Sequence, residues 1–553
     1  MKDPKLVRKY RLLDMHIADF EDKLDGLKNY ETNMFIPTLA NRKMMQAELD
    51  ALIARQKALE APDEVFCIVK DHCADFLEGV QLKLDNMYKS PLYVSDFWGF
   101  NFSRMIRMDT RPDTVRKMII ETRMAHHEPY FTAVFEWLDE LPINELNGLL
   151  ARMKLLSNII SVELEETSIF MKNLCEKELK ELLEKMQFFV KETLGKWALK
   201  LEKIIAEKGA QAKAEPLGEA DTLTLDKETY RMALKSHGVD LDDMLGWYES
   251  EIEKTRRECF EIANSLDIPE KPVTTMTEVN DILFKYAGPA DSVEEMFRRG
   301  DEYTKRGTAA AREYIWLPED ADCPPMPVYK QMRAYCPWGA GGLASVYSRP
   351  FQGTWMINDD NYKAVTDGWL KIMSTHEVNP GHYSQFLRTL LDPIPETFKR
   401  GAKHACMTEG MCIRTEKLFE YIFAEDPYYP LFTAYRRHHT SVRIKVDLWL
   451  RYFGKTIGDV VELYGTELGF DQKSARGQVQ AHEDMYGYFT TYYNGYKKIA
   501  DLEKFYGFDK KEYTELLFSI GRVSLNTFER FLKLSESDRF SLLHEFPSLV
   551  QFK

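Results

Sequence analysis

Two histidines and two glutamates carry the chemistry that stands out in this 553-residue chain. His376 and Glu377 are neighbours in the segment THEVNPGHYSQ, and His382 follows a Pro-Gly pair. Hydrolytic zinc sites combine histidine nitrogens with a carboxylate and keep one position open for water. A glutamate beside the first histidine is the usual general base that takes a proton from that water. The segment therefore predicts a metal site with His376 and His382 as ligands and Glu377 as catalytic base.

The spacing of the two histidines differs from that of the H-E-x-x-H motif, in which they are four residues apart. Here they are six apart, and on a regular helix their side chains would point about 120° away from each other. Pro380 cannot donate to the carbonyl of His376, so the helix must kink or bulge there. Gly381 relaxes the limits on the backbone. We expect this distorted turn to bring His382 back to the metal.

A second segment, TEGMCIRTEK, supplies the remaining acidic groups. Glu409 and Glu416 are seven residues apart and share one face of a predicted helix. Glu409 is the expected third metal ligand, and Glu416 is expected to orient a ligand from behind. Cys406 and Cys412 lie close enough in sequence to keep a small chance of a role.

These motifs resemble a known bacterial family. The pattern H-E-x-x-P-G-H-x-x-Q followed by E-G-x-x-x-x-x-E is similar to that of domain of unknown function 885. The similarity continues in Arg443-Ile-Lys-Val-Asp447 and, loosely, from Tyr486 to Gly495, and it covers most of the chain from about Pro216 onward. The resemblance implies a zincin-type metallopeptidase with a mostly helical fold, and Asp447 as a supporting residue behind the site.

Three departures from the family pattern lie in the C-terminal part, which the resemblance places against the substrate. Arg451 stands where the family has His, Ala481-His482 stands where it has Arg-Tyr, and Tyr486 and Tyr488 replace a Pro and a Gln. One hypothesis is that Arg451 and His482 have exchanged the roles of carboxylate clamp and transition-state donor. The alternative for Arg451 is an ion pair with a neighbour near Asp447.

An aromatic-rich run follows, which contains Tyr486, Tyr488, Tyr492, Tyr493 and Tyr496. A tyrosine hydroxyl can stabilise the oxyanion of a tetrahedral intermediate. We therefore take Tyr486, Tyr492 and His482 as candidate catalytic residues, and Tyr488 and Arg451 as candidate substrate-binding residues. The alternative is that most of these tyrosines pack in the core or line a pocket wall.

The elements that must position these residues are mostly helices. Periodic apolar residues predict a helical region over 1–208, and a linker rich in Gly and Pro follows at 209–221. The catalytic region is 222–553, and the two regions are expected to pack as one two-lobed unit. A strand-and-loop region is predicted between Pro318 and Asp360. It includes the run Gly339–Gly342, read as a flap or a turn, and TWMIND, read as an edge strand that could pair with an extended substrate.

The expected fold is therefore mostly α, a multi-helix, zincin-like, two-lobed fold with a small β element beside the active-site cleft. The run Arg436-Arg437-His438-His439 is interpreted as a solvated helix face. The oligomeric state does not follow from the sequence.

Composition limits the function classes. The net charge is −14 and the pI near 5.5, which argues against a general nucleic-acid binder. No apolar stretch reaches the ~20 residues of a membrane span, and the N-terminus lacks the apolar region of a secretory signal. The scattered cysteines favour a reducing cytoplasm. We expect one zinc ion per chain, although another divalent metal would fit the same ligands.

Three functions stay open at this point. The first is a peptidase acting on short peptides or peptide-like molecules. The second is a metal-dependent hydrolase or lyase of a small non-peptide amide. The third is a metal-binding protein without turnover, against which the retained Glu377 argues.

Overall fold

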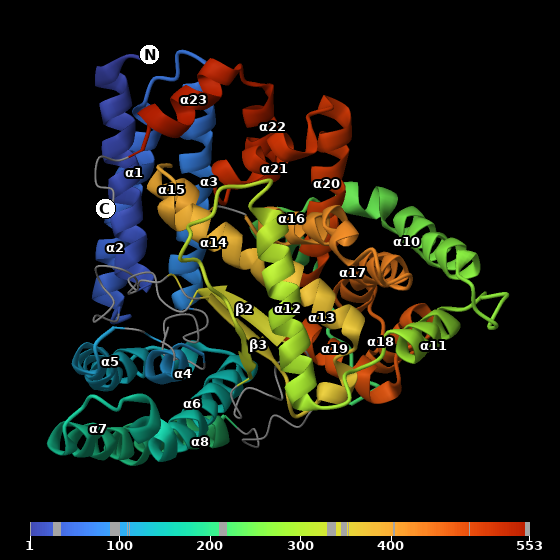
Figure 1. Ribbon diagram of the computed structural model, residues 1–553. Helices are drawn as coiled ribbons and strands as arrows, with labels where there is room; N and C mark the ends of the chain where they lie inside the picture. Colours follow the sequence, from blue (N-terminus) through green and yellow to red (C-terminus); the bar gives the residue numbers. More distant parts are fainter. Residues whose placement is uncertain are drawn as a thin grey trace.

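The structure is a computed structural model, and it is mostly helical around one small sheet (Figure 1). It describes residues 2–25, 35–88, 100–107, 109, 111–208, 218–328, 339–343, 351, 353–401, 404–485 and 487–547. The prediction of a mostly α protein with a small β element is confirmed. The zincin-like, two-lobed arrangement stays a prediction. None of the described helices combines the length and the apolar character that crossing a membrane requires.

The N-terminal helices fall into two groups, which Figure 1 shows in blue and in teal. The first group consists of α1 (Pro4–Asp25), α2 (Leu39–Ala58) and α3 (Glu64–Met87). The second consists of α4 (Phe100–Arg107), α5 (Asp113–Val134), α6 (Ile143–Phe170), α7 (Glu176–Phe188), the π-helical turn Phe189–Leu194 and α8 (Gly195–Glu207), with a short 3-10 turn at Leu138–Glu140. Side chains cap several of these helices. For example, Asp63 accepts from the amides of Val65 and Phe66 at the start of α3.

The two ends of the chain share one hydrophobic core. Helices α1 and α3 pack against α15 (Glu396–Arg400), α22 (Leu525–Lys533) and α23 (Glu536–Glu545). Polar contacts tie the same elements together, since Asp14 accepts from the amides of Glu396 and Thr397 at 2.7 and 3.0 Å. The N-terminal region therefore packs directly on the C-terminal helices. The predicted linker lies mostly outside the described residues.

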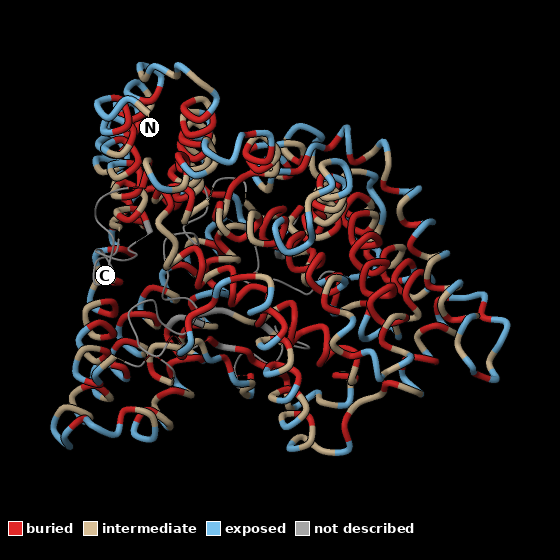
Figure 2. Tube along the Cα trace, turned by 45° about the horizontal axis from the view of Figure 1, so that its top comes forward, coloured by how far each residue is buried: buried red, intermediate tan, exposed pale blue. Residues whose placement is uncertain are grey.

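A second core surrounds the candidate site. It is built from helices α9 (Lys227–Ser236), α10 (Leu241–Ser265), α11 (Met276–Tyr286), α12 (Val293–Ala311), α13 (Asp367–Met373), α14 (His382–Leu391), α16 (Ala405–Leu418), α17 (Tyr429–Arg451), α18 (Ile457–Leu468), α19 (Gln472–Asp484) and α20 (Thr491–Tyr506). Short 3-10 turns lie at Tyr362–Ala364, Glu420–Phe423 and Tyr488–Thr490, and α21 (Lys510–Ser519) joins the first core. Buried segments gather toward the middle of the molecule (Figure 2).

The sheet has the order β1-β3-β2, with β1 (Pro325–Pro327), β2 (Gly339–Leu343) and β3 (Gly353–Ile357). β1 runs parallel to β3, and β2 runs antiparallel to it. The predicted strand-and-loop region is confirmed, but two details were wrong. The TWMIND segment forms the central strand and not an edge strand, and Gly339–Gly342 lies in a strand and not in a turn or flap. Both depend on pairing between distant segments, which local composition does not reveal.

Candidate metal centre

The first two candidate ligands lie on either side of a helix break. α13 begins at a Thr366 cap and continues into a π-helical turn, Ser374–Val378, which carries His376 and Glu377. The cis peptide Asn379-Pro380 follows, and α14 then begins at His382. The sequence predicted a kink or bulge in one helix; the structure has a π-helical turn, after which a separate helix begins. A Cβ at Gly381 would lie 1.8 Å from the His376 carbonyl oxygen, so glycine is needed because the backbone passes so close.

This break brings the two imidazole rings together, despite the six-residue spacing. Their centroids are 4.9 Å apart and their planes are nearly perpendicular, at 88°. The Nε2 atoms of His376 and His382 each lie 3.5 Å from the same oxygen, Oε2 of Glu409. Neighbouring ligand atoms around a tetrahedral zinc ion are about 3.3 Å apart when the bonds are ~2.0–2.1 Å long. The Glu409 oxygen therefore lies at about this separation from each of the two imidazole nitrogens.

Glu409 fits the role of a ligand in a second respect. Its side chain is 3% exposed, and Oε2 has no hydrogen-bond partner among the described residues. An unpartnered carboxylate oxygen is costly to bury unless a cation compensates it. Burial would raise the pKa of Glu409, but His382 and His376 hold that pKa well below its usual range. The carboxylate is thus ionised and available to a metal.

The other ring nitrogens of both histidines have partners of their own. His376 Nδ1 is 2.7 Å from Glu416 Oε1, as the predicted supporting role of Glu416 requires. His382 Nδ1 is 3.4 Å from Cys412 Sγ. Such contacts fix the tautomer and the orientation of a ligating imidazole, so that Nε2 is left free for the ion. Burial lowers the pKa of His376, but Glu409 and Glu416 outweigh it and raise that pKa to about 9.

Ligand atoms of His376, His382 and Cys412 lie within 4.8 Å of one another, and this buried group could also hold a metal ion. The two candidate sets differ in the third ligand. Cys412 Sγ contacts the Nδ1 side of His382, whereas Glu409 faces the Nε2 atoms of both rings. The geometry therefore favours Glu409 as the third ligand and Cys412 as a contact behind His382.

Comparison with known proteins agrees with the motifs. The profile of a family described as bacterial protein of unknown function (DUF885) matches residues 17–532. The chain belongs to this family. No curated protein matches it. Among solved structures, a putative lipoprotein from Colwellia psychrerythraea is 16% identical with a TM-score of 0.75, and the match covers 95% of this chain and 97% of that one.

A second structure, of a putative lipoprotein of unknown function from Shewanella oneidensis, is 14% identical with a TM-score of 0.69, over 95% of this chain and 99% of that one. At these identities, the two structures show that the DUF885 chain shares their fold.

The general-base candidate lies beside the sheet. Glu377 is half-buried, between the two histidines in sequence. A Cβ added to Gly341 of β2 would lie 2.9 Å from Glu377 Oε2, so the strand passes directly over this carboxylate. β2 has β3 on one side and is an edge strand among the described strands. The edge strand β2 and the candidate base Glu377 therefore face the same space. The sequence had assigned the role of an edge strand that pairs with the substrate to TWMIND.

Two of the candidate tyrosines reach the centre of this DUF885 protein. The Tyr488 hydroxyl donates to Glu409 Oε1, the oxygen that does not face the histidines. The Tyr492 ring stacks on His376, with centroids 6.1 Å apart and 9° between the planes. Burial and the carboxylate of Glu409 raise the pKa of both phenols, which keeps them protonated as donors. Tyr486 lies outside the described residues.

Two of the residues that depart from the family pattern, Arg451 and His482, lie elsewhere. Arg451 donates to the carbonyls of Leu223, His482 and Glu483, so its guanidinium holds backbone segments together. His482 lies between Asp447 and the Tyr464 hydroxyl, at 3.1 and 3.0 Å. The rings of Phe489 and Tyr492 stand between His482 and His376. The structure does not bring Arg451 or His482 to the centre.

Asp447 is linked to the candidate site through the loop that carries Tyr488. Its carboxylate accepts from the Gly487 amide at 3.0 Å and from Tyr230 at 2.6 Å. Gly487 has a φ of +79° and precedes the short turn that carries Tyr488. Asp447 therefore fixes the loop from which Tyr488 reaches Glu409. Its predicted supporting role at a metal site stays a prediction.

The interpretation of Arg436-Arg437-His438-His439 as a solvated face was wrong, because all four side chains are buried. α17 is buried along nearly its whole length, against α10, α18 and α20 among others. The sequence shows polar residues there, but it does not show that the helix runs through the middle of the fold. Arg436 Nε lies 3.4 Å from Glu416 Oε1, so one of these residues borders the metal centre.

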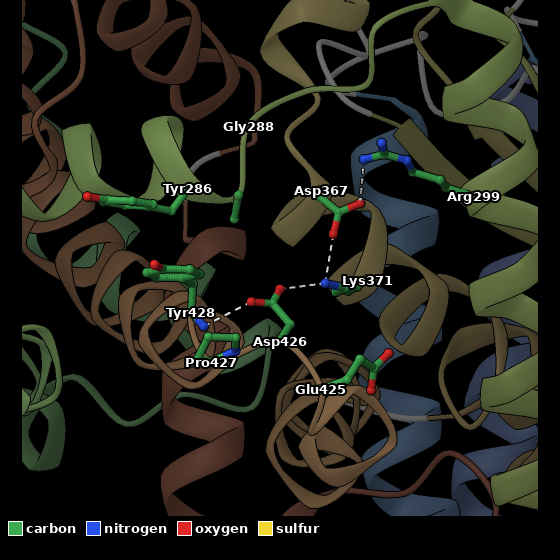
Figure 3. Close-up of a pocket in the computed structure, with 10 residues that line it drawn as sticks. Tyr286, Gly288, Arg299, Asp367, Lys371, Glu425, Asp426, Pro427 and Tyr428 are labelled. Atoms are coloured by element: carbon green, nitrogen blue, oxygen red, sulfur yellow. Dashed lines mark hydrogen bonds and ion pairs between the residues drawn. The ribbon is translucent and has the colours of Figure 1, made fainter. Parts of the chain in front are cut away.

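A hollow of about 340 Å³ lies in a different place, beside α13 and the loop before α17 (Figure 3). Its charged groups already have partners: Lys371 lies between Asp367 and Asp426, and Arg299 contacts Asp367. Glu425 pairs with Arg306, which lies outside the lining. The candidate ligands do not line it. We therefore place the chemistry at the histidine pair and not in this hollow.

Proposed function

We propose that the protein is a zinc-dependent hydrolase of the metallopeptidase type, which cleaves an amide bond in short peptides or peptide-like molecules. The observation that carries the proposal is the convergence of two imidazole nitrogens on one unpartnered carboxylate oxygen, each at 3.5 Å, with Glu377 next to the first histidine. A purely structural metal site would not need a half-exposed carboxylate at that position.

His376, His382 and Glu409 would hold the ion. Two neutral imidazoles and one carboxylate form a ligand set typical of catalytic zinc, and a fourth position is left for water. The chemistry that such an ion supplies is acidification of a water molecule and polarisation of an amide carbonyl. Glu416 and Cys412 keep the two rings oriented, and Tyr488 holds the Glu409 carboxylate.

The protein's own residues would carry the protons. Glu377 takes a proton from the attacking water and delivers it to the leaving amine, so the base becomes the acid in the second half of the reaction. The protonated Tyr492 phenol, stacked on His376, is placed to donate to the oxyanion that develops on the carbonyl. An extended substrate along the edge of β2 that has no partner among the described strands would lie over Glu377.

The test uses Glu377→Gln, which keeps the size of the side chain and removes the base. Wild type and variant are loaded with zinc and assayed against a library of short peptides. We expect equal zinc content and a loss of kcat of about 10²–10⁴-fold, the usual contribution of a general base. Glu420→Gln, another half-buried glutamate, is the matched control and should keep full activity. Unchanged kcat in Glu377→Gln would remove this residue from the mechanism.

A further inference from the structure

Two arginines border the centre on one face of α17. Arg436 and Arg443 are seven residues apart, and each is 6% exposed. Their guanidinium groups lie over the same aromatic ring, that of Tyr492, at 5.8 and 5.1 Å from its centroid. That ring also stacks on His376. Both positive charges are therefore held beside the predicted metal ligands.

Among the described residues, Arg436 has only a shared carboxylate partner and Arg443 has none, whereas buried arginines normally pair with a carboxylate. In the described part of the chain, Arg436 meets a single carboxylate, Glu416 at 3.4 Å, which is already engaged by His376. Arg443 donates to the neutral amide oxygen of Gln478 at 3.1 Å, and its Nε, although buried, has no partner there. Burial and the charge of Arg436 together lower the pKa of Arg443.

The arginine next along the helix shows the ordinary arrangement. Arg437 is also buried, but its guanidinium donates to Glu258 at 2.5 Å. Arg414 on α16 likewise pairs with Glu503, at 2.7 Å. Arg437 and Arg414 thus each have a carboxylate partner of a kind that, in the described part of the chain, neither Arg436 nor Arg443 has to itself. A buried guanidinium with spare donors is a strong site for a carboxylate.

The charges of the loaded centre lead to the same conclusion. Glu377, Glu409 and Glu416 bring three negative charges, whereas a divalent ion and the two arginines bring four positive ones. One positive charge is left over in a mostly buried site. A single carboxylate on the substrate would neutralise it.

We propose that Arg436 and Arg443 form a carboxylate-binding subsite, so that the enzyme acts on peptides with a free carboxylate close to the scissile amide. This rests on the proposed function and names its substrate class. The carboxylate belongs either to the C-terminus of a short peptide or to an acidic side chain. Glu377, Tyr488 and Tyr492 keep part of their surface exposed, so the centre is open to solvent on the side of these residues.

Binding is measured first, because it does not need turnover. The zinc-loaded Glu377→Gln protein is titrated calorimetrically with acetyl-dialanine, with acetyl-dialanine amide, and with acetyl-aspartyl-alanine amide. We expect a carboxylate compound to bind about 30-fold or more tightly than the neutral amide, the usual effect of a desolvated charge pair. Tighter binding of acetyl-dialanine would identify the C-terminus as the source, and tighter binding of the aspartyl compound would identify the side chain. Equal affinity for all three would overturn the subsite.

Variants then assign the effect to the arginines. Arg443→Gln should abolish the preference for a carboxylate and leave affinity for the neutral amide unchanged. Arg443→Lys should retain part of the preference for a carboxylate. Arg437→Gln is the matched control and should keep the preference. An equal loss for charged and neutral compounds would mean that Arg443 only positions Tyr492, and would overturn the proposal. If Arg443→Gln does not fold, the wild-type comparison and Arg443→Lys still decide.

The carboxylate-binding subsite and the proposed hydrolase activity can each fail without the other, and the assays distinguish the two cases. In active wild type, the subsite predicts a higher kcat/KM for the free acid than for its amide, mainly through KM. A protein that binds carboxylates selectively but hydrolyses none of the peptides would keep the subsite and lose the hydrolase. Hydrolysis of the free acid and its amide at equal kcat/KM would support the hydrolase and overturn the subsite.

Discussion

Gly410 on α16 and Gly495 on α20 are in direct backbone contact. A Cβ added to Gly410 would lie 2.2 Å from the carbonyl carbon of Gly495, and one added to Gly495 would lie 1.9 Å from the Cys406 carbonyl oxygen. Among the described elements, these two helices have the most extensive contact. Glu409 precedes the first glycine and Tyr492 comes three residues before the second, so this crossing sets the distance between a metal ligand and the tyrosines.

The first prediction tests this crossing. Gly410→Ala forces the two helices apart, because the clash is with backbone that cannot rotate away. We expect a loss of stability of about 1–3 kcal/mol or more, with weaker zinc binding as Glu409 moves away from the histidines. Thermal unfolding and zinc content measure the two effects. Gly477→Ala in α19 is the control, since its Cβ would meet nothing within 4 Å, and it should be neutral or stabilising. Wild-type values for Gly410→Ala would contradict the argument.

The second prediction decides between the two candidate ligand sets. If Glu409 is the third ligand, Glu409→Ala and His382→Ala lose bound zinc, whereas Cys412→Ser retains about one zinc per chain with affinity reduced by about 10-fold to 100-fold, as for a residue that only orients a ligand. Elemental analysis of the purified proteins measures this directly. Loss of zinc from Cys412→Ser with retention in Glu409→Ala would instead make Cys412 the ligand.

The third prediction concerns stability at low pH, away from the centre. His72 on α3 is fully buried, its ring 4.1 Å from that of Phe398 on α15. Burial lowers the pKa of His72 from 6.5 to about 4. The unfolded chain therefore takes up a proton first as the pH falls, and the free energy of unfolding decreases between about pH 6.5 and 4, by up to about 3 kcal/mol from this group.

Chemical denaturation at a series of pH values measures this slope. His72→Leu removes the titrating group and should flatten the curve of unfolding free energy against pH over the same window. His127 and His438, whose pKa values are also lowered by burial, remain in the variant and still contribute to the pH dependence. A curve for His72→Leu parallel to that of wild type would show that His72 does not titrate in this way.

Local patterns determined much of this protein. The helices follow from apolar periodicity, the break after Glu377 follows from Pro380 and Gly381, and the family follows from the spacing of the histidine and glutamate motifs. Each of these depends on residues a few positions apart, where the backbone itself sets the geometry. The supporting contact of Glu416 could also be anticipated, because it shares a helical face with Glu409.

Other features were decided only by the tertiary structure. The approach of Glu409 to the histidines depends on α16 packing against α20 at a glycine pair, and the burial of α17 depends on the helices around it. β3 became the central strand because two distant segments pair with it. Arg443 looks like any surface arginine in the sequence, since solvent exposure and missing partners are properties of packing between remote segments and not of local order.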